Sequence, residues 1–177
     1  MYSREILIDK NVQVEVNGME VKIKGPRGEG RRIFKVTYPI KIEINNDKII
    51  VSCDSERRKQ KALVGTIAAH IKNMMEDVVH GYYAKLKVVY MHFPVKLEKK
   101  DKKLIIKNFL GEKTIREIEP IGNSEIKIDN EIIIVEGCDR EDVMQTANRI
   151  EQSCRITGYD RRVFLDGIYI IESGKIS

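Results

Sequence analysis

Histidine and cysteine are the residue types whose spacing in a sequence most clearly marks a metal site or a reactive thiol. The six such residues are widely spread: His70, His80, His92, Cys53, Cys138 and Cys154. None of them form a pair with the spacing of metal ligands, and no Cys-x-x-Cys occurs. His70 and His80 are ten residues apart, nearly three helical turns, so they cannot share one ion. We therefore expect no metal site, and we expect the cysteines to be buried rather than reactive.

Motifs for acyl or phosphate chemistry are also missing. The chain has no Gly-x-Ser-x-Gly, no Walker-type phosphate loop and no dinucleotide fingerprint. The stretch from Gly25 to Gly30 is rich in glycine, but its proline and its place after a strand match none of these motifs. Arg27 within it is a candidate anion contact, and a plain hairpin loop is an equally good interpretation. We expect no cofactor and no catalytic site.

The stretch 106–116, Ile-Lys-Asn-Phe-Leu-Gly-Glu-Lys-Thr-Ile-Arg, has the composition of a binding loop instead. Phe109 stands just before a Leu-Gly pair, with Lys107, Lys113 and Arg116 around it. Cations neutralise phosphates, and arginine or an exposed aromatic ring can stack on bases. A buried Phe109 would be core instead, and the residues leave both options open. For the segment 90–93, Tyr-Met-His-Phe, core is the favoured interpretation.

Alternating apolar and polar residues predict short antiparallel strands around these loops. Asn17-Gly18 predicts a tight hairpin turn, because both positions tolerate positive φ. Apolar residues at three- and four-residue steps predict a helix over about 56–80, ended by Gly81. Asp139 is placed to cap a second helix, which Gly158 closes. The tail 159–171 mixes arginines with large apolar residues.

An internal repeat organises the chain. A shift of 83 positions aligns Val12 with Val95, Ile23 with Ile106, and the segment 49–51 with 132–134. Two further residues of offset align Cys53 with Cys138 at a strand-to-helix corner. Each half then contains hairpins followed by a helix. We predict an α+β fold of two similar tandem domains, 1–81 and 82–177, each an antiparallel sheet covered by one main helix.

Charge is distributed unevenly over the 177 residues, whose net charge is +5 and whose pI is near 9.0. Residues 85–116 carry ten Lys or Arg and three acids, a local net of +7. Residues 117–142 carry nine acids and two basic residues, a net of −7. This pattern predicts a polarised second domain with a basic face for nucleic acid. The alternative is a protein–protein adaptor that uses the acidic surface of residues 117–142, and a small hydrolase working through carboxylates is a third possibility.

Four motifs in register carry a resemblance to a known family. The chain resembles the large-subunit ribosomal protein L6 family, in the archaeal and eukaryotic branch whose eukaryotic member is called L9. The resemblance runs from about residue 8 to residue 174. The motifs are Gly-Pro-Arg-Gly at 25–28, Val-Tyr-Met-His-Phe-Pro at 89–94, Lys-Asn-Phe-Leu-Gly-Glu-Lys at 107–113, and Phe-Leu-Asp-Gly-Ile-Tyr at 164–169.

This resemblance implies a structural protein of the large ribosomal subunit in the cytosol, not an enzyme. The family binds large-subunit ribosomal RNA near the sarcin–ricin loop and the stalk base. Its expected neighbours are large-subunit and stalk-base ribosomal proteins, with translation factors docking nearby and no membrane involved. In the family the second domain and the tail make most RNA contacts. Carried onto this chain, the contacts are Lys107, Phe109, Lys113, Arg116, Arg155, Arg161 and Arg162.

Overall fold

The computed structural model describes residues 2–55, 57–160 and 162–176. The chain divides into two compact units, Met1–His80 and Gly81–Ser177, each with its own hydrophobic core. Within the described residues no helix is both long and apolar enough to span a bilayer. The units are described separately below.

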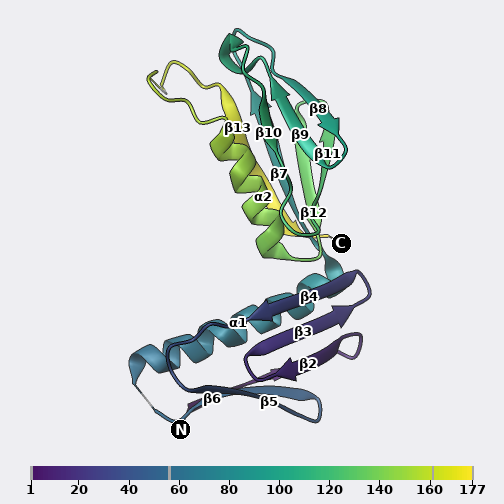
Figure 1. The fold of residues 1–177 in the computed structure, drawn as a ribbon, viewed down its shortest axis with the longest axis vertical. Coiled ribbons are helices and arrows are strands. Elements are labelled where there is room, and N and C mark those ends of the chain that lie inside the picture. The colour runs from purple at the N-terminus through teal and green to yellow at the C-terminus, as the bar shows by residue number, and fades with distance from the viewer. Residues whose placement is uncertain (1, 56, 161, 177) are drawn as a thin grey trace. The chain divides into compact units, whose positions relative to one another are not determined.

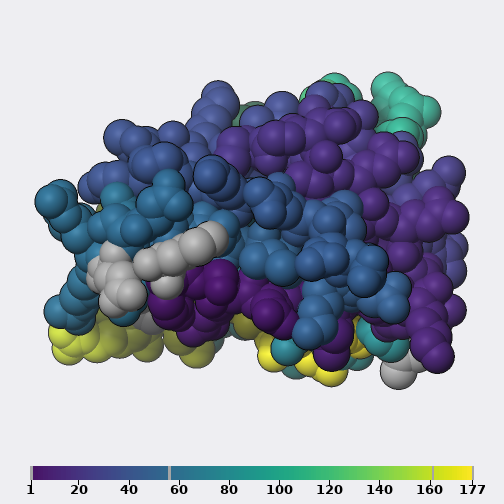
Figure 2. Space-filling view, turned by 90° about the horizontal axis from the view of Figure 1, so that it is seen from below, coloured from purple at the N-terminus to yellow at the C-terminus, as the bar shows by residue number. Residues whose placement is uncertain are grey.

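Unit 1 contains six strands and one helix. The strands form two antiparallel sheets in the orders β1-β6-β5 and β2-β3-β4. Helix α1 packs on both sheets (Figure 1). On one face of the unit the start of the chain lies beside the helix (Figure 2), with Lys61 Nζ 5.2 Å from the Tyr2 ring centre. The elements are β1 (Tyr2–Leu7), β2 (Gln13–Asn17), β3 (Glu20–Gly25), β4 (Gly28–Ile33), β5 (Ile40–Asn45), β6 (Lys48–Cys53) and α1 (Arg58–His80).

Unit 2 repeats this plan and adds one strand. Its sheets have the orders β10-β9-β8 and β11-β12-β7-β13, and α2 packs along β7, β12 and β13 (Figure 1). The added strand is β13, which pairs with the free edge of β7. The elements are β7 (Tyr82–Val89), β8 (Lys96–Lys100), β9 (Lys103–Lys107), the 3-10 turn η1 (Phe109–Gly111), β10 (Arg116–Ile118), β11 (Glu125–Asp129), β12 (Ile132–Gly137), α2 (Arg140–Ser153) and β13 (Gly167–Lys175).

The predicted α+β class is confirmed, although each unit holds two antiparallel sheets rather than one. Asp139 caps α2 as expected, because its carboxylate accepts a hydrogen bond of 2.8 Å from the Glu141 amide. Gly81 follows α1 with a φ of 76°, the conformation expected of a glycine cap. Negative charge in the first turn of α2 also stabilises the helix, because it interacts favourably with the positive end of the helix dipole.

Two details of register differ from the prediction. The β2–β3 turn is Gly18-Met19 rather than Asn17-Gly18, since Asn17 already pairs with Glu20 and only Gly18 has positive φ. A turn with glycine first needs one positive φ, not two.

The repeat offset at β6 and β12 is 84 rather than 83. Asn46 and Asn130 occupy matching turns with φ of 52° and 53°. Fully buried Ile49 in β6 thus corresponds to fully buried Ile133 in β12. A slip of one residue would turn an inward side chain outward. With this offset Cys53, at the end of β6, matches Gly137, so the two cysteines at 53 and 138 are not equivalent.

Close packing of the β3–β4 hairpin on α1 gives a first testable prediction. A Cβ on Gly25 would lie 2.7 Å from Val78 Cγ2 and 2.8 Å from the Val78 carbonyl oxygen. The Gly25→Ala substitution should therefore destabilise the protein by about 1–3 kcal/mol, measured by urea unfolding. Gly30→Ala is the matched control, because its Cβ would lie 3.4 Å from the flexible end of Met74 and 3.8 Å from Val78 Cγ1, both ordinary or nearly ordinary contacts. Equal stability of the two variants would contradict this packing.

Candidate nucleic-acid interface

Three loop segments meet at one end of unit 2, and their described residues together form its loop end: residues 90–95, residues 108–115, and residues 154–160 with 162–166 (Figure 1). Side-chain hydrogen bonds join the segments. The Met91 amide donates to Asp166 Oδ1 at 3.1 Å, and Asn108 Nδ2 donates to the Pro94 carbonyl at 2.9 Å. Arg116, the first residue of β10, donates to the Ser153 carbonyl at the end of α2. The three segments therefore form one surface.

Phe109 lies beneath this surface, not on it. Its side chain is only 2% exposed and belongs to the unit 2 core. The Arg116 guanidinium lies over the ring, 4.6 Å from its centre, and also pairs with Glu112 at 2.7 Å. A ring enclosed in this way is not placed to stack on a base, so the structure favours the core alternative for Phe109 over the stacking alternative. Phe109 positions Arg116 and the loop above it.

The segment 90–93 also differs from the prediction, but here residues that were expected in the core are exposed. Core was favoured for it, but strand β7 ends at Val89 and all four following side chains are exposed. Phe93 is 46% exposed and lies against Gly111 of the neighbouring segment. The signal for this was Pro94, because proline ends a strand and places the preceding apolar residues in a loop. Exposed large apolar side chains of the loop end are Tyr90, Met91, Phe93, Ile115, Tyr159, Val163 and Leu165.

The predicted cations differ in how far they are already engaged. Lys107 Nζ pairs with Glu98 at 2.6 Å across the β8–β9 hairpin, and Arg116 is held by Glu112 and Ser153. Lys113 and Arg155 are exposed, with no acidic partner among the residues that the structure describes. Arg162 is 93% exposed and reaches Asp160 only at 3.9 Å. Among the predicted cations of unit 2 that the structure describes, these three are available to an anionic partner.

Two predicted contacts lie elsewhere. Arg161 falls outside the described residues. Arg27 belongs to unit 1, in the tight turn between β3 and β4, where its backbone amide donates to the Val78 carbonyl at 3.0 Å. Its side chain is exposed. Within its own unit Arg27 is thus a hairpin turn residue docked on α1, with its guanidinium directed to solvent or a partner.

The basic and acidic segments, which are separate along the sequence, lie next to each other in the folded unit. Basic β8 and β9 pair with acidic residues of the following segment, so opposite charges interleave. Lys99 pairs with Glu125 at 3.3 Å, Lys127 with Glu136 at 2.6 Å, and Lys103 with Glu119. The hydrogen bond from Lys103 lowers the pKa of Glu119. Three of the nine acidic residues of 117–142 are therefore paired with lysines within unit 2, which reduces the negative charge that this stretch presents.

Two of the three cysteines are core residues, whereas Cys138 is only partly buried. Cys53 and Cys154 are buried, and burial raises the pKa of the Cys154 thiol, which disfavours the reactive thiolate. Over the described residues, no group of three or more His, Cys, Asp or Glu is placed to hold a metal ion.

Comparison with known proteins agrees with this interpretation. The family model for ribosomal protein L6 matches residues 8–81 and 93–167, one match in each unit. The large ribosomal subunit protein uL6 of Desulfurococcus amylolyticus is 47% identical over 98% of this chain and 95% of its own length. The proteins of that name from Staphylothermus marinus and Methanosarcina mazei are 48% and 42% identical, over 97% and 96% of this chain and 94% and 96% of their own lengths.

These matches confirm the resemblance found in the sequence motifs, including its archaeal and eukaryotic branch. The matched family is one of ribosomal structural proteins and not of enzymes. The two model matches also follow the tandem repeat of the fold. From the paired matches and the nearly full-length relatives, we conclude that the chain belongs to the ribosomal protein L6 family.

Proposed function

We propose that this protein is a structural constituent of the large ribosomal subunit and that it binds large-subunit ribosomal RNA through the loop end of unit 2. The observation that carries this proposal is the composition of that surface. Exposed aromatic and apolar side chains from three segments stand among the available cations Lys113, Arg155 and Arg162. Folded RNA offers a partner for each kind of side chain: phosphates for the cations and unstacked bases for the aromatic and apolar groups.

The finer location follows from the family resemblance. We propose that the protein lies near the sarcin–ricin loop and the stalk base of the cytosolic ribosome. Large-subunit and stalk-base proteins would be its neighbours, and translation factors would dock close by. Arg155 and Arg162, two of the three tail residues that the resemblance assigns to RNA, belong to the loop end, and Arg161 lies outside the described residues.

The mode of binding is electrostatic anchoring combined with shape recognition. Lys113 lies in an exposed loop, whereas Arg116 is fixed by Phe109, Glu112 and Ser153. A preorganised loop loses less conformational entropy when it binds than a free one does. The buried ring of Phe109 therefore supports RNA binding indirectly, by holding the 108–115 segment in a single conformation.

The protein–protein adaptor is not favoured by any observation. It required a free acidic surface, but Glu119, Glu125 and Glu136 each pair with a lysine of the same unit. Exposed ion pairs of this kind contribute little to stability, yet they reduce the charge available to a partner.

The proposal predicts selective and salt-dependent binding. Purified protein should bind transcripts of archaeal large-subunit ribosomal RNA more tightly than small-subunit transcripts of equal length. With about three phosphate contacts, log Kd should change with log salt by a slope of about 2–3, a roughly 15- to 60-fold loss between 50 and 200 mM salt. Fluorescence anisotropy measures both quantities. Salt-insensitive binding, or equal affinity for both RNAs, would refute the proposal.

A further inference from the structure

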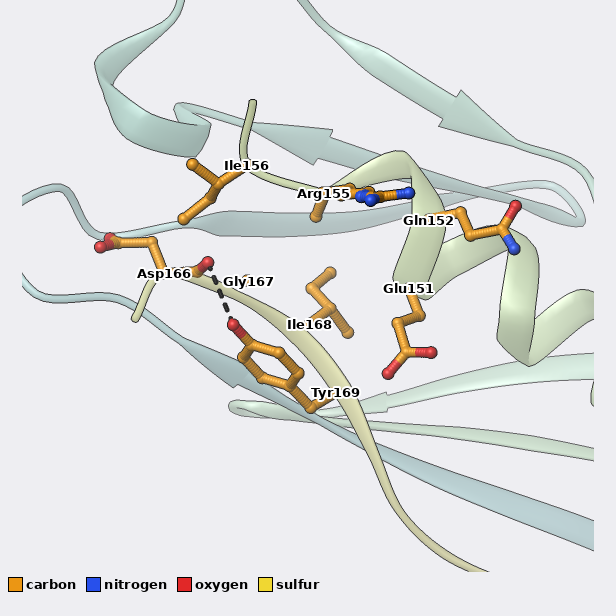
Figure 3. A pocket seen from close by; sticks show the side chains of 9 residues that line it. Glu151, Gln152, Arg155, Ile156, Asp166, Gly167, Ile168 and Tyr169 are labelled. Atoms are coloured by element: carbon orange, nitrogen blue, oxygen red, sulfur yellow. Dashed lines mark hydrogen bonds between the residues drawn. The ribbon is translucent and has the colours of Figure 1, made fainter. Parts of the chain in front are cut away.

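A hollow opens between the end of α2 and the start of β13, within unit 2 (Figure 3). Its volume is about 340 Å³, near the lower end of the roughly 300–1,000 Å³ typical of small-molecule sites. Buried Ile156 and Ile168 contribute an apolar part, while Glu151, Arg155 and Tyr169 contribute polar or aromatic groups. A cavity of this size suits one planar ring and not a helix or an extended peptide.

The Tyr169 ring is held in a fixed position at this hollow. Its hydroxyl donates to the Leu165 carbonyl at 3.2 Å and approaches the Asp166 carbonyl at 3.4 Å (Figure 3). The ring packs on Gly167, where a Cβ would lie 2.9 Å from Tyr169 Cζ. Glycine is therefore needed at 167 for the ring to fold back in this way. Although fixed, Tyr169 remains 43% exposed and is available for stacking.

Glu151 supplies the hydrogen-bonding group. It extends from the last turns of α2 toward β13, and its Oε1 accepts from the Ile170 amide at 3.3 Å (Figure 3). That contact fixes the carboxylate beside the hollow and leaves further lone pairs unused, since each oxygen has two. Asp166 does not converge with it, because the Asp166 carboxylate points away and accepts from the Met91 amide. One carboxylate and one aromatic ring thus border the same space.

We propose that this hollow is a binding site for an unpaired guanine of ribosomal RNA. The base would stack on Tyr169, its Watson–Crick edge would face Glu151, and Arg155 at the rim would meet the adjoining phosphate. A carboxylate offers only acceptors, and guanine presents two adjacent donors, N1–H and the N2 amino group. Adenine and cytosine place an acceptor next to their amino donor, and uracil flanks N3–H with two carbonyls. Glu151 therefore selects guanine.

The RNA source of the base follows from the position of the hollow. Arg155 belongs to the loop end, and β13 begins where that surface stops. The inference rests on the proposed RNA-binding function and extends it to one nucleotide. An RNA duplex buries the Watson–Crick edge, so the recognised guanine must be in a loop or bulge.

Chemical footprinting tests the site directly. Kethoxal reacts with N1 and N2 of unpaired guanine, the edge assigned to Glu151. Wild-type protein bound to a large-subunit transcript should protect one such guanine. Glu151→Gln should lose this protection at saturating protein, although glutamine can still accept from the Ile170 amide. Tyr169→Ala should raise Kd for the transcript by about 5- to 150-fold, the usual cost of losing one stacked base.

The controls separate this site from the RNA-binding function as a whole. Glu43→Gln and Tyr38→Ala remove matched exposed groups in unit 1 and should leave both protection and Kd unchanged. RNA binding without a guanine protected in a Glu151-dependent manner overturns the base site and leaves the proposed function standing. No binding to large-subunit RNA overturns both. Micromolar binding of free guanosine monophosphate, combined with no protection in RNA, would make the ligand a free nucleotide and overturn the RNA source.

Discussion

Phe109→Ala is expected to destabilise unit 2 by about 3–5 kcal/mol, the usual cost of deleting a buried phenylalanine ring. The ring is 2% exposed and touches a core that also contains Ile106 and Ile118. Its removal leaves a cavity and also takes away the surface on which the Arg116 guanidinium lies, 4.6 Å from the ring centre. A unit of this size should then melt on the order of 20 °C lower.

Urea unfolding followed by circular dichroism measures this loss, and peptide-resolved hydrogen exchange assigns it to unit 2 with unit 1 as the internal reference. Phe93→Ala is the matched control in the same loop end. Its ring is 46% exposed, so its removal should cost less than about 1 kcal/mol. A Phe109→Ala protein with native stability and weakened RNA binding would contradict the buried role and restore the stacking role.

The contrast between these two phenylalanines shows what the sequence can and cannot decide. Both stand beside loop residues, and both belong to motifs of the family. Pro94 is a local signal that places Phe93 in a loop, whereas the burial of Phe109 depends on which segments pack over its ring, a tertiary property with no local signature. Phe109 is covered because Arg116 crosses it toward Ser153, a carbonyl distant in sequence. No periodicity within 106–116 predicts that contact.

The helices and hairpins were predictable because their signals are local. The three- and four-residue spacing in α1, the cap at Asp139 and the alternating strands need no knowledge of distant segments. Strand β13 lacked such a signal. Ile168 to Ile171 form a continuous apolar run without alternation, and a register shift between Ile170 and Glu172 interrupts its pairing with β7.

The distribution of charge over the surface was the property that the linear sequence predicted least well. Segments of +7 and −7 predicted two faces, yet antiparallel pairing and sheet contacts bring the two segments side by side. Glu172 shows the same effect in β13: hydrogen bonds from Tyr83 at 2.6 Å and Lys85 at 2.9 Å lower its pKa. Only the side-chain charges that are not paired within the unit are available to a partner. These unpaired charges, and not the net charge of the chain, identify the cations worth testing.

Replacing Lys113, Arg155 and Arg162 together with glutamine should therefore abolish most RNA affinity while unit 2 stays folded. Each phosphate contact contributes about 0.7–0.9 to the salt exponent, which at 0.1 M salt corresponds to a roughly 5- to 8-fold effect on affinity. Three contacts together predict a loss of about 10²-fold and a salt slope reduced by about 2–3. Their exposure makes a loss of folding stability small, within about 0.5 kcal/mol for each.

The control removes the same formal charge from unit 1, by glutamine at the exposed residues Lys10, Lys41 and Lys72. Both variants carry a net charge three lower than the wild type, so a general attraction to polyanions would weaken both equally. If the binding site is at the loop end, only the loop-end variant loses RNA affinity, and only that variant has a lower salt slope. Equal losses in the two variants would show that RNA responds to the overall charge of the protein and not to this surface. Anisotropy titrations between 50 and 200 mM salt distinguish these outcomes, because a long-range field and a set of phosphate contacts differ in slope as well as in affinity.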